Sequence, residues 1–205
     1  MSYLEQLNPV YKNPLLDEMK IYANLHHVPI IQDEGLELLI HVIEISKASR
    51  VLEIGSAIGY SALQMIFRTG VHVTTIERDP EMIELAKRHF TTSGKEKNVT
   101  LIEGDALTIP NDIFGLYDVI FIDAAKGQYI KFFEKYEKYL APHGVIFTDN
   151  LLFHDMVGKD LVDKNKRTRQ LVNKIHQFNE WVTKKEEYHT HIYEIGDGIA
   201  LSYLK

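Results

Sequence analysis

A short buried strand followed by a glycine turn and a helix constrains the fold of this chain more than any other feature. Residues 51–54 form a short, mainly apolar run with a β-branched residue, which predicts a buried strand. Gly55 and Gly59 follow, and apolar residues at helical spacing resume from Leu63. Glycine lets the backbone adopt positive φ or approach a ligand closely. Such a unit begins an open α/β sheet, in which ligands bind outside the carboxyl ends of the strands.

The spacing of the glycines indicates which ligand the turn receives. The run is Glu53-x-Gly55-x-x-x-Gly59, whereas dinucleotide-binding folds usually carry G-x-G-x-x-G. It resembles the first motif of the class I methyltransferases that use S-adenosylmethionine (SAM). SAM has no pyrophosphate, so it needs no phosphate cradle at the helix N-terminus, and a carboxylate near the turn suits its cationic amino group. A Gly-x-x-x-Gly turn is also common in other Rossmann-like sheets, so this motif alone leaves both interpretations open.

Length and composition favour one domain over residues 1–205, because a chain of 205 residues that is 45% hydrophobic can bury one sizeable core. The chain has no cysteine, which excludes a disulfide framework and a thiolate metal site. No apolar run approaches the ~18 residues of a membrane span. The N-terminus lacks the pattern of a signal peptide, so we expect no membrane partner and a cytoplasmic location. The net charge of −6 argues weakly against general nucleic-acid binding and leaves room for a local basic surface.

The remaining patterns extend the first unit into a complete sheet. An irregular or short helical arm at 1–13 and two helices, beginning at Asn13-Pro14 and at Asp33, make up an N-terminal helical cap at 1–45. Strands are predicted at 71–77, 98–103, 117–123 and 145–149. One helix is predicted from Asp79 to about residue 94, and another from the end of the fourth strand to about residue 140, before a turn at 142–144. A basic loop and helix insertion occupies 151–185, and a hairpin at 191–204 follows. The predicted fold class is a Rossmann-like α/β sheet, mostly parallel with an antiparallel C-terminal hairpin and helices on both faces.

Acidic residues stand at or just past the carboxyl ends of all five predicted parallel strands: Glu53, Glu77, Asp105, Asp123 and Asp149. They should share one rim of the sheet, facing the ligand crevice. Glu77 follows the glycine turn at the distance of about 20 residues that suits an acid binding both ribose hydroxyls of a nucleoside. Asp105 and Ala106 could lie along the adenine edge. The simpler alternatives are a helix-capping acid at Glu77 and an ordinary turn at Asp105.

Three of these polar residues form a second set. Asp123, Asp149 and Asn150 would supply two carboxylates and an amide oxygen, which are hard ligands for Mg²⁺ or Ca²⁺. The fourth and fifth strands are plausible neighbours in the sheet, so the three oxygens could converge. The alternative is that Asp149 and Asn150 merely form a turn after a strand.

The sequence around these residues is similar to that of a known family. The run at 121–129, Phe-Ile-Asp-Ala-Ala-Lys-Gly-Gln-Tyr, and the triplet Thr148-Asp149-Asn150 resemble the metal-dependent O-methyltransferases, which include catechol and caffeoyl-CoA O-methyltransferases. The resemblance covers about residues 25 to 205. It implies Mg²⁺ at Asp123, Asp149 and Asn150. It implies a SAM site at Ile30, Glu53, Gly55, Ser61, Glu77, Asp105, Ala106 and Asp123.

The resemblance also assigns a role to Lys126, which matches the family's lysine beside the metal and is the expected general base of catalysis. Without the metal motif, a solvated lysine at a helix start would be the simpler interpretation. The chain has Asp-Ala-Ala-Lys where the plant enzymes have Asp-Ala-Asp-Lys, so the contact made by their second aspartate is absent. Family members are commonly dimers, which implies a homodimer here.

A basic segment indicates the acceptor. Residues 151–185 contain eight Lys and Arg against four acids, a net charge of +4 in a chain of −6. Such a cluster suits a phosphate backbone, although an ordinary solvated helix face remains the alternative. The segment and the run at 121–129 resemble the bacterial tRNA 5-hydroxyuridine methyltransferases, which implies methylation of the 5-hydroxyl of the wobble uridine, position 34 of the anticodon loop, to 5-methoxyuridine. The expected RNA-binding residues are Lys164, Lys166, Arg167 and Arg169.

Three other functions compete with this prediction. A small-molecule catechol O-methyltransferase would share the same site and would not need the basic residues. A nicotinamide-dependent oxidoreductase is disfavoured by the missing G-x-G-x-x-G and by the C-terminal hairpin. A nucleic-acid-binding module without catalysis would leave Asp123, Asp149 and Asn150 without a purpose.

Overall fold

The computed structural model describes residues 3, 7–8, 11–110 and 115–205, which include a seven-stranded mixed sheet in the order β3-β2-β1-β4-β5-β7-β6. The parallel strands are β1 (Arg50–Ile54), β2 (His72–Glu77), β3 (Val99–Glu103), β4 (Tyr117–Ile122) and β5 (Leu140–Thr148). The antiparallel strands are β6 (Tyr188–Tyr193) and β7 (Ile199–Leu204). The predicted sheet and its C-terminal hairpin are therefore confirmed.

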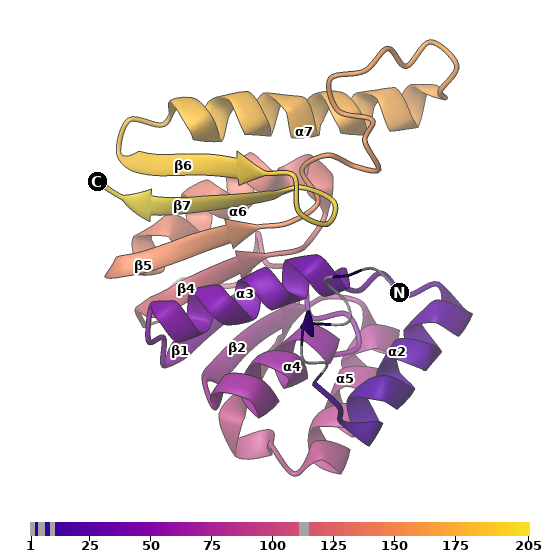
Figure 1. Ribbon diagram of the computed structural model, residues 1–205, viewed down its shortest axis with the longest axis vertical. Helices are drawn as coiled ribbons and strands as arrows, with labels where there is room; N and C mark the ends of the chain where they lie inside the picture. Colours follow the sequence, from indigo (N-terminus) through magenta and orange to yellow (C-terminus); the bar gives the residue numbers. More distant parts are fainter. Residues whose placement is uncertain (1–2, 4–6, 9–10, 111–114) are drawn as a thin grey trace.

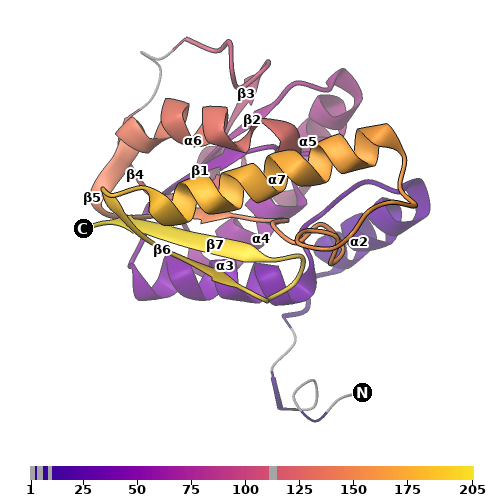
Figure 2. The same cartoon turned by 90° about the horizontal axis from the view of Figure 1, so that it is seen from above.

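Helices cover both faces of this sheet (Figures 1 and 2). One layer contains α2 (Pro14–His26), α3 (Asp33–Ile45), α4 (Tyr60–Thr69) and α5 (Pro80–Ser93), and the other contains α6 (Tyr129–Tyr136) and α7 (Lys166–Lys184). Short 3-10 turns lie at η1 (Glu96–Asn98), η3 (Lys126–Gln128) and η4 (Glu137–Tyr139). Among the described residues, no helix is long and apolar enough to cross a membrane.

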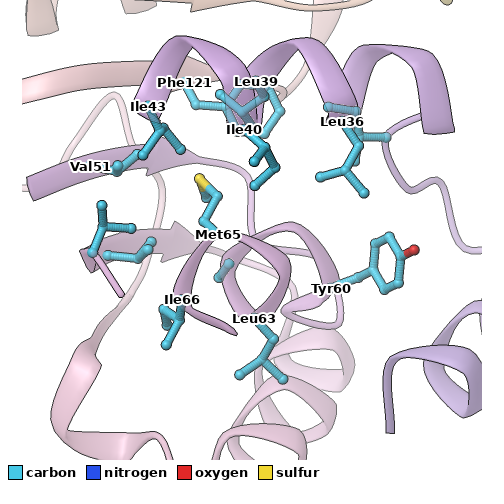
Figure 3. Packing of buried hydrophobic residues seen from close by; sticks show 14 of the residues in the cluster. Leu36, Leu39, Ile40, Ile43, Val51, Tyr60, Leu63, Met65, Ile66 and Phe121 are labelled. Atoms are coloured by element: carbon cyan, nitrogen blue, oxygen red, sulfur yellow. The ribbon is translucent and has the colours of Figure 1, made fainter. Parts of the chain in front are cut away.

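Alternate residues of the central strands build the two halves of the core. Val51 of β1 packs in the cluster formed with α3 and α4, whereas the next residue, Leu52, joins the cluster formed with α6 and α7. Figure 3 shows Leu39 and Ile43 of α3 on one side of the first cluster and Met65 of α4 reaching toward them. Because helices cover both faces, the central strands are mostly apolar on both sides. This burial is the physical reason for the mainly apolar run at 51–54, in which Glu53 is the buried exception.

The strand order reverses beside β1, and this reversal locates the crevice. The chain runs outward from β1 to β2 and β3, then returns to the other side of β1 as β4. In open α/β sheets, ligands bind at such a switch point, outside the carboxyl ends of the strands. The register pairs Ile54 with Ile122, so Gly55 and Asp123 leave the sheet side by side.

Three predicted boundaries need correction, and part of the predicted arm lies outside the described residues (1–2, 4–6 and 9–10). The hairpin begins at Tyr188, the start of β6, and not at residue 191. Asn13 and Asp79 cap their helices as predicted, accepting hydrogen bonds from the first-turn amides. Asp33, however, is the first residue of α3 and not its cap: the N-cap is Gln32, which makes no side-chain capping bond. The Asp33 carboxylate pairs instead with Lys20 Nζ at 2.6 Å. A long-range ion pair therefore replaces the local cap.

The fifth strand begins earlier than predicted. β5 starts at Leu140, and the expected turn at 142–144 lies within it, where the register against β4 shifts between Tyr117 and Val119. The extra residues bulge out of the ladder, and such a bulge lets the strand contain a Pro-His-Gly sequence without ending. The carboxyl end of β5 is unaffected, so Asp149 still follows it directly.

Candidate active site

The glycine turn lies against the end of the neighbouring strand. Gly55 has φ +101°, and a Cβ built on it would lie 2.2 Å from the backbone oxygen of Asp123. Gly59 has φ +81°, and its Cβ would lie 2.8 Å from the ring of Phe90. Both positions therefore require glycine, for conformation and for close approach. The turn brings the start of α4 and the end of β4 to one side of the same cleft.

This cleft has a volume of about 840 Å³, within the range of small-ligand and cofactor sites. Its lining includes most of the residues predicted to contact SAM, namely Ile30, Gly55, Ser61, Glu77, Asp105, Ala106 and Asp123. Lys126 and Asn150 also line it. The structure thus brings together residues from six separate segments of the chain at the predicted rim.

Two acids at this rim are held by backbone amides. Glu77 Oε2 accepts from Ala57 N at 2.8 Å, so the end of β2 is tied to the glycine turn. Asp105 Oδ1 accepts from Leu107 N at 2.8 Å, and its Oδ2 lies 3.1 Å from Arg78 Nη1. The Leu107 amide and the Arg78 guanidinium lower the pKa of Asp105, against the effect of partial burial. Both side chains are thus fixed as acceptors facing a polar ligand.

Glu53 lies behind the turn and not among the described residues that line the cleft. It is fully buried, and it accepts from Ser61 Oγ and from Thr75 Oγ1, each at 2.5 Å. Burial raises its pKa from 4.5 to about 7, assisted by repulsion from Asp123 and Glu77 and opposed by the two hydroxyls. In this geometry Glu53 connects the start of α4 to β2, and it reaches the cleft through Ser61.

The raised pKa of Glu53 predicts how stability depends on pH. A carboxyl group whose pKa is higher in the folded state stabilises the fold at low pH, and this contribution is lost as pH rises through about 7. We expect the ligand-free protein to lose stability between about pH 5 and pH 8 relative to Glu53→Gln, by an amount on the order of 3 kcal/mol at most. Urea unfolding at several pH values measures this difference. Glu44→Gln, which alters an exposed glutamate, is the control, and equal pH dependence in wild type and Glu53→Gln would contradict the expectation.

The second predicted set of side chains converges at the ends of β4 and β5. Asn150 Nδ2 donates to Asp123 Oδ1 at 2.9 Å, and the Asn150 backbone N–H donates to Asp149 Oδ1 at 2.7 Å. Lys126 Nζ, from η3, donates to Asn150 Oδ1. Asn150 has φ +65°, a conformation that asparagine tolerates better than most residues. The four side chains form one hydrogen-bonded group, defined here as the oxygen cluster with its lysine.

The electrostatics of the oxygen cluster suit a cation. Burial raises the pKa of both Asp123 and Asp149, and repulsion from the Asp123 carboxylate raises the pKa of Asp149 further. Burial lowers the pKa of Lys126, although Asp123, Asp197 and Asp149 oppose this. Two buried carboxylates and an amide oxygen are hard donors that fit a divalent cation such as Mg²⁺. Among the described residues no group of three or more His, Cys, Asp or Glu could hold a metal, so a cation bound here would need the amide oxygen of Asn150 as its third protein donor.

Comparison with known proteins identifies the family. Residues 5–205 match the sequence profile of the O-methyltransferase family. The chain belongs to the O-methyltransferase family. The glycine motif resembles that of class I, SAM-dependent methyltransferases. The family match begins at residue 5, whereas the predicted resemblance covers about residues 25 to 205.

Individual relatives agree with this assignment. The O-methyltransferase ankF of Aspergillus thermomutatus is 31% identical over 172 residues, covering 78% of this chain and 72% of that protein. A crystal structure from Staphylococcus aureus, assigned as a caffeoyl-CoA O-methyltransferase, is 39% identical with a TM-score of 0.88, covering 94% and 93% of the two chains. TomG of Streptomyces achromogenes, an O-methyltransferase crystallised with SAM, shares the fold over 100% of both chains, with 21% identity and a TM-score of 0.79.

The basic residues predicted to bind RNA in this O-methyltransferase lie beside the cleft and not in it. The four predicted RNA-binding residues are exposed, at the start of α7 and just before it, and none is among the described residues that line the cleft. Farther along α7, Leu171 does line the cleft, and a Cβ on Gly127 would lie 3.3 Å from Lys174 Cδ. Helix α7 therefore packs directly over η3, which carries Lys126. The predicted homodimer stays a prediction.

The sequence analysis missed several residues of the site. His26, His27 and Phe153 line the cleft, and Asp197 approaches Lys126 from the hairpin turn. The first two end α2, where nothing in the helical pattern indicates a ligand. The sequence signal for Asp197 is its place between Gly196 and Gly198, a pattern that indicates the turn of the predicted hairpin and not a site residue.

Proposed function

We propose that this O-methyltransferase transfers the methyl group of SAM to the 5-hydroxyl of 5-hydroxyuridine at the tRNA wobble position, in a reaction that depends on Mg²⁺. The observation that carries the proposal of hydroxyl methylation is the oxygen cluster with its lysine, lying at the wall of a cleft large enough for a cofactor and an acceptor base. The acceptor offers a hydroxyl beside the 4-carbonyl, which is a pair of oxygens that one divalent cation can receive.

The residues of the SAM half of the cleft have separate tasks in this proposal. Glu77 accepts from the ribose hydroxyls, Asp105 and Ala106 lie along the adenine, and Gly55 allows the backbone to approach the methionine part of SAM. The acidic rim also favours a ligand with a sulfonium and an ammonium group. TomG, which has the same fold and was crystallised with SAM, supports this assignment.

The residues of the acceptor half deprotonate and orient the hydroxyl. Asp123, Asp149 and Asn150 would hold Mg²⁺, which when bound stabilises the negative charge of the acceptor oxygen. Lys126 Nζ takes the proton from the hydroxyl, and the lowered pKa of Lys126 favours this role. Helix α7 packs over η3 and so holds the lysine in place. The main contribution of the chain to the rate is to hold the two reactants in attack geometry.

The choice of tRNA is supported by the basic start of α7. The net charge of +4 in residues 151–185 is carried on a helix that borders the cleft, so a phosphate backbone could lie along α7 while one base enters. An anticodon base is already single-stranded and can be splayed into a pocket. A small catechol is the second candidate, favoured by the likeness to the Staphylococcus aureus caffeoyl-CoA-type structure.

One experiment separates these acceptors. Purified protein is incubated with methyl-labelled SAM and Mg²⁺, and offered either tRNA rich in 5-hydroxyuridine or a panel of catechols, with and without a chelator. We expect chelator-sensitive label in the tRNA. Label only in catechols would overturn the RNA acceptor and leave methyl transfer intact. Label in neither, together with no binding of SAM, would overturn the proposed activity as a whole.

The basic residues provide a sharper prediction. Arg167→Ala combined with Arg169→Ala should lower tRNA methylation by about tenfold or more at moderate salt, because two phosphate contacts are removed, and should leave any catechol methylation unchanged. The matched control is Arg88→Ala combined with Lys97→Ala, which removes the same charge from exposed, described residues outside the cleft lining. Equal losses in both double variants would contradict a specific RNA surface on α7.

A further inference from the structure

A buried carboxylate from the hairpin turn reaches the catalytic lysine. Asp197, between β6 and β7, is only 6% exposed. Its Oδ2 lies 3.8 Å from Lys126 Nζ and has no hydrogen-bond partner among the described residues. A turn between two glycines is normally the most solvated part of a hairpin, so a buried acid there needs an explanation.

The same aspartate fastens the segment that follows β5. Its Oδ1 accepts from His154 N at 2.5 Å, and its backbone oxygen accepts from Leu152 N at 2.7 Å. The next residue, Gly198, accepts from Leu151 N at 2.9 Å, and a Cβ on Gly198 would lie 2.8 Å from Leu152 N. The hairpin turn and residues 151–154 are therefore in direct backbone contact, and glycine is required for that approach.

That segment needs to be fastened because its backbone is strained. Phe153, His154 and Asp155 have φ of 46°, 55° and 58°, three consecutive residues in the left-handed region. Asp and His enter this region more often than most residues do, so the strain is greatest at the bulky Phe153. Such conformations persist only where surrounding contacts enforce them, and they concentrate at functional sites. The contacts from Asp197 and Gly198 supply part of that enforcement.

One residue of the strained segment, Phe153, forms part of the wall of the acceptor site, whereas Asp155 is exposed and is not among the described residues that line the cleft. Phe153 lines the cleft, and its ring centroid lies 5.3 Å from Lys126 Nζ. Asp197 therefore acts on two neighbours at once: through Oδ1 it holds the segment that carries Phe153, and through Oδ2 it attracts the ammonium of Lys126. In this arrangement the lysine lies between Asn150, Phe153 and Asp197.

We propose that Asp197 is a positioning residue that fixes both Lys126 and the Phe153 wall for methyl transfer. The proposal rests on the proposed function, in which Lys126 receives the proton of the acceptor. Asp197 is not among the described residues that line the cleft. Its negative charge holds the Lys126 side chain in place and stabilises the ammonium that forms when the neutral amine takes the proton, and its hydrogen bond to His154 keeps the aromatic wall beside the lysine.

Two variants separate the two contacts. Asp197→Asn keeps an oxygen for the His154 amide and removes the charge that attracts Lys126, whereas Asp197→Ala removes both. The matched control is Asp155→Asn, which neutralises an exposed aspartate of the same segment and suits its positive φ. Thermal unfolding and SAM binding are measured first for every variant, so that loss of the fold is recognised.

The first readout is kinetic. For Asp197→Asn we expect kcat to fall by about tenfold or more, with the KM and Kd for SAM within about twofold of wild type, because the SAM half of the cleft is untouched. Asp155→Asn should keep the wild-type kcat. An Asp197→Asn enzyme with wild-type kcat, or an equal loss in Asp155→Asn, would overturn the proposal.

The second readout needs no acceptor, so it is independent of the proposed function. We expect faster acylation of the Lys126 amine in Asp197→Asn, measured by peptide mass against the exposed Lys131, because the side chain is no longer held against a buried carboxylate. Hydrogen exchange at residues 152–156 should be faster in Asp197→Ala and near wild type in Asp197→Asn. Unchanged labelling of Lys126 in Asp197→Asn would overturn the proposal. A wild type that methylates neither tRNA nor catechol would overturn the proposed function alone.

Discussion

Replacing Lys126 by methionine is expected to slow methyl transfer by about 10²–10⁴-fold, the range that a positioned general base contributes. Methionine retains the length and apolar stem of lysine, but it cannot take a proton from the acceptor or donate to Asn150 Oδ1. In the proposed function SAM lies against the glycine turn, Glu77 and Asp105, which Lys126 does not contact, so SAM affinity should change little. The expected loss is therefore in kcat and not in the binding of SAM.

Single-turnover rates at saturating SAM measure this loss directly, and calorimetry with SAM alone measures the affinity. The matched control is Lys131→Met, which replaces an exposed lysine in the first turn of the next helix, α6. A Lys126→Met enzyme that transfers methyl groups as fast as Lys131→Met would show that the proton leaves by another route. Weak SAM binding in Lys126→Met would instead assign the lysine to the cofactor site.

The part of the site that the sequence predicted well is the part built from strand ends. Glu77 ends β2, Asp123 directly follows β4, and Asp105 lies just past β3. Parallel strands bring their carboxyl ends to one rim. Once the strands were assigned, the convergence of Asp149 with Asp123 required only that β4 and β5 be neighbours. Short-range patterns were sufficient here because each pattern locates one strand end, and the parallel sheet brings these ends together.

The remainder depends on contacts between distant segments, which no local pattern encodes. Asp197 approaches Lys126 because the hairpin turn packs on residues 151–154, and these adopt positive φ without glycine. Asp33 likewise has the local pattern of a helix cap, but it pairs with Lys20 because the fold brings α2 and α3 together, which the local pattern does not encode. Glu53 was predicted to line the SAM site, yet its geometry shows a buried acid that supports Ser61.

Replacing Gly55 by alanine is expected to weaken SAM binding by more than about 100-fold, equivalent to roughly 2.7 kcal/mol. The added Cβ would lie 2.2 Å from the backbone oxygen of Asp123 and 3.0 Å from its carbonyl carbon, and backbone atoms of a central strand cannot move aside as a flexible side chain can. Relief of the collision must displace either the turn that faces SAM or the end of β4 that carries Asp123. Both halves of the cleft should therefore suffer.

The control for this substitution is Gly70→Ala, because Gly70 also has positive φ, +75°, but nothing lies within 4 Å of its Cβ position. It isolates backbone strain from collision, and it should cost roughly 1 kcal/mol of stability while leaving SAM affinity unchanged. Urea unfolding and calorimetry with SAM measure the two effects separately for each variant. If Gly55→Ala lost only stability, as Gly70→Ala should, then the close contact between the turn and Asp123 would not organise the cofactor site. A selective loss of SAM affinity in Gly55→Ala would establish that the contact between the ends of β1 and β4 holds the two halves of the active site together.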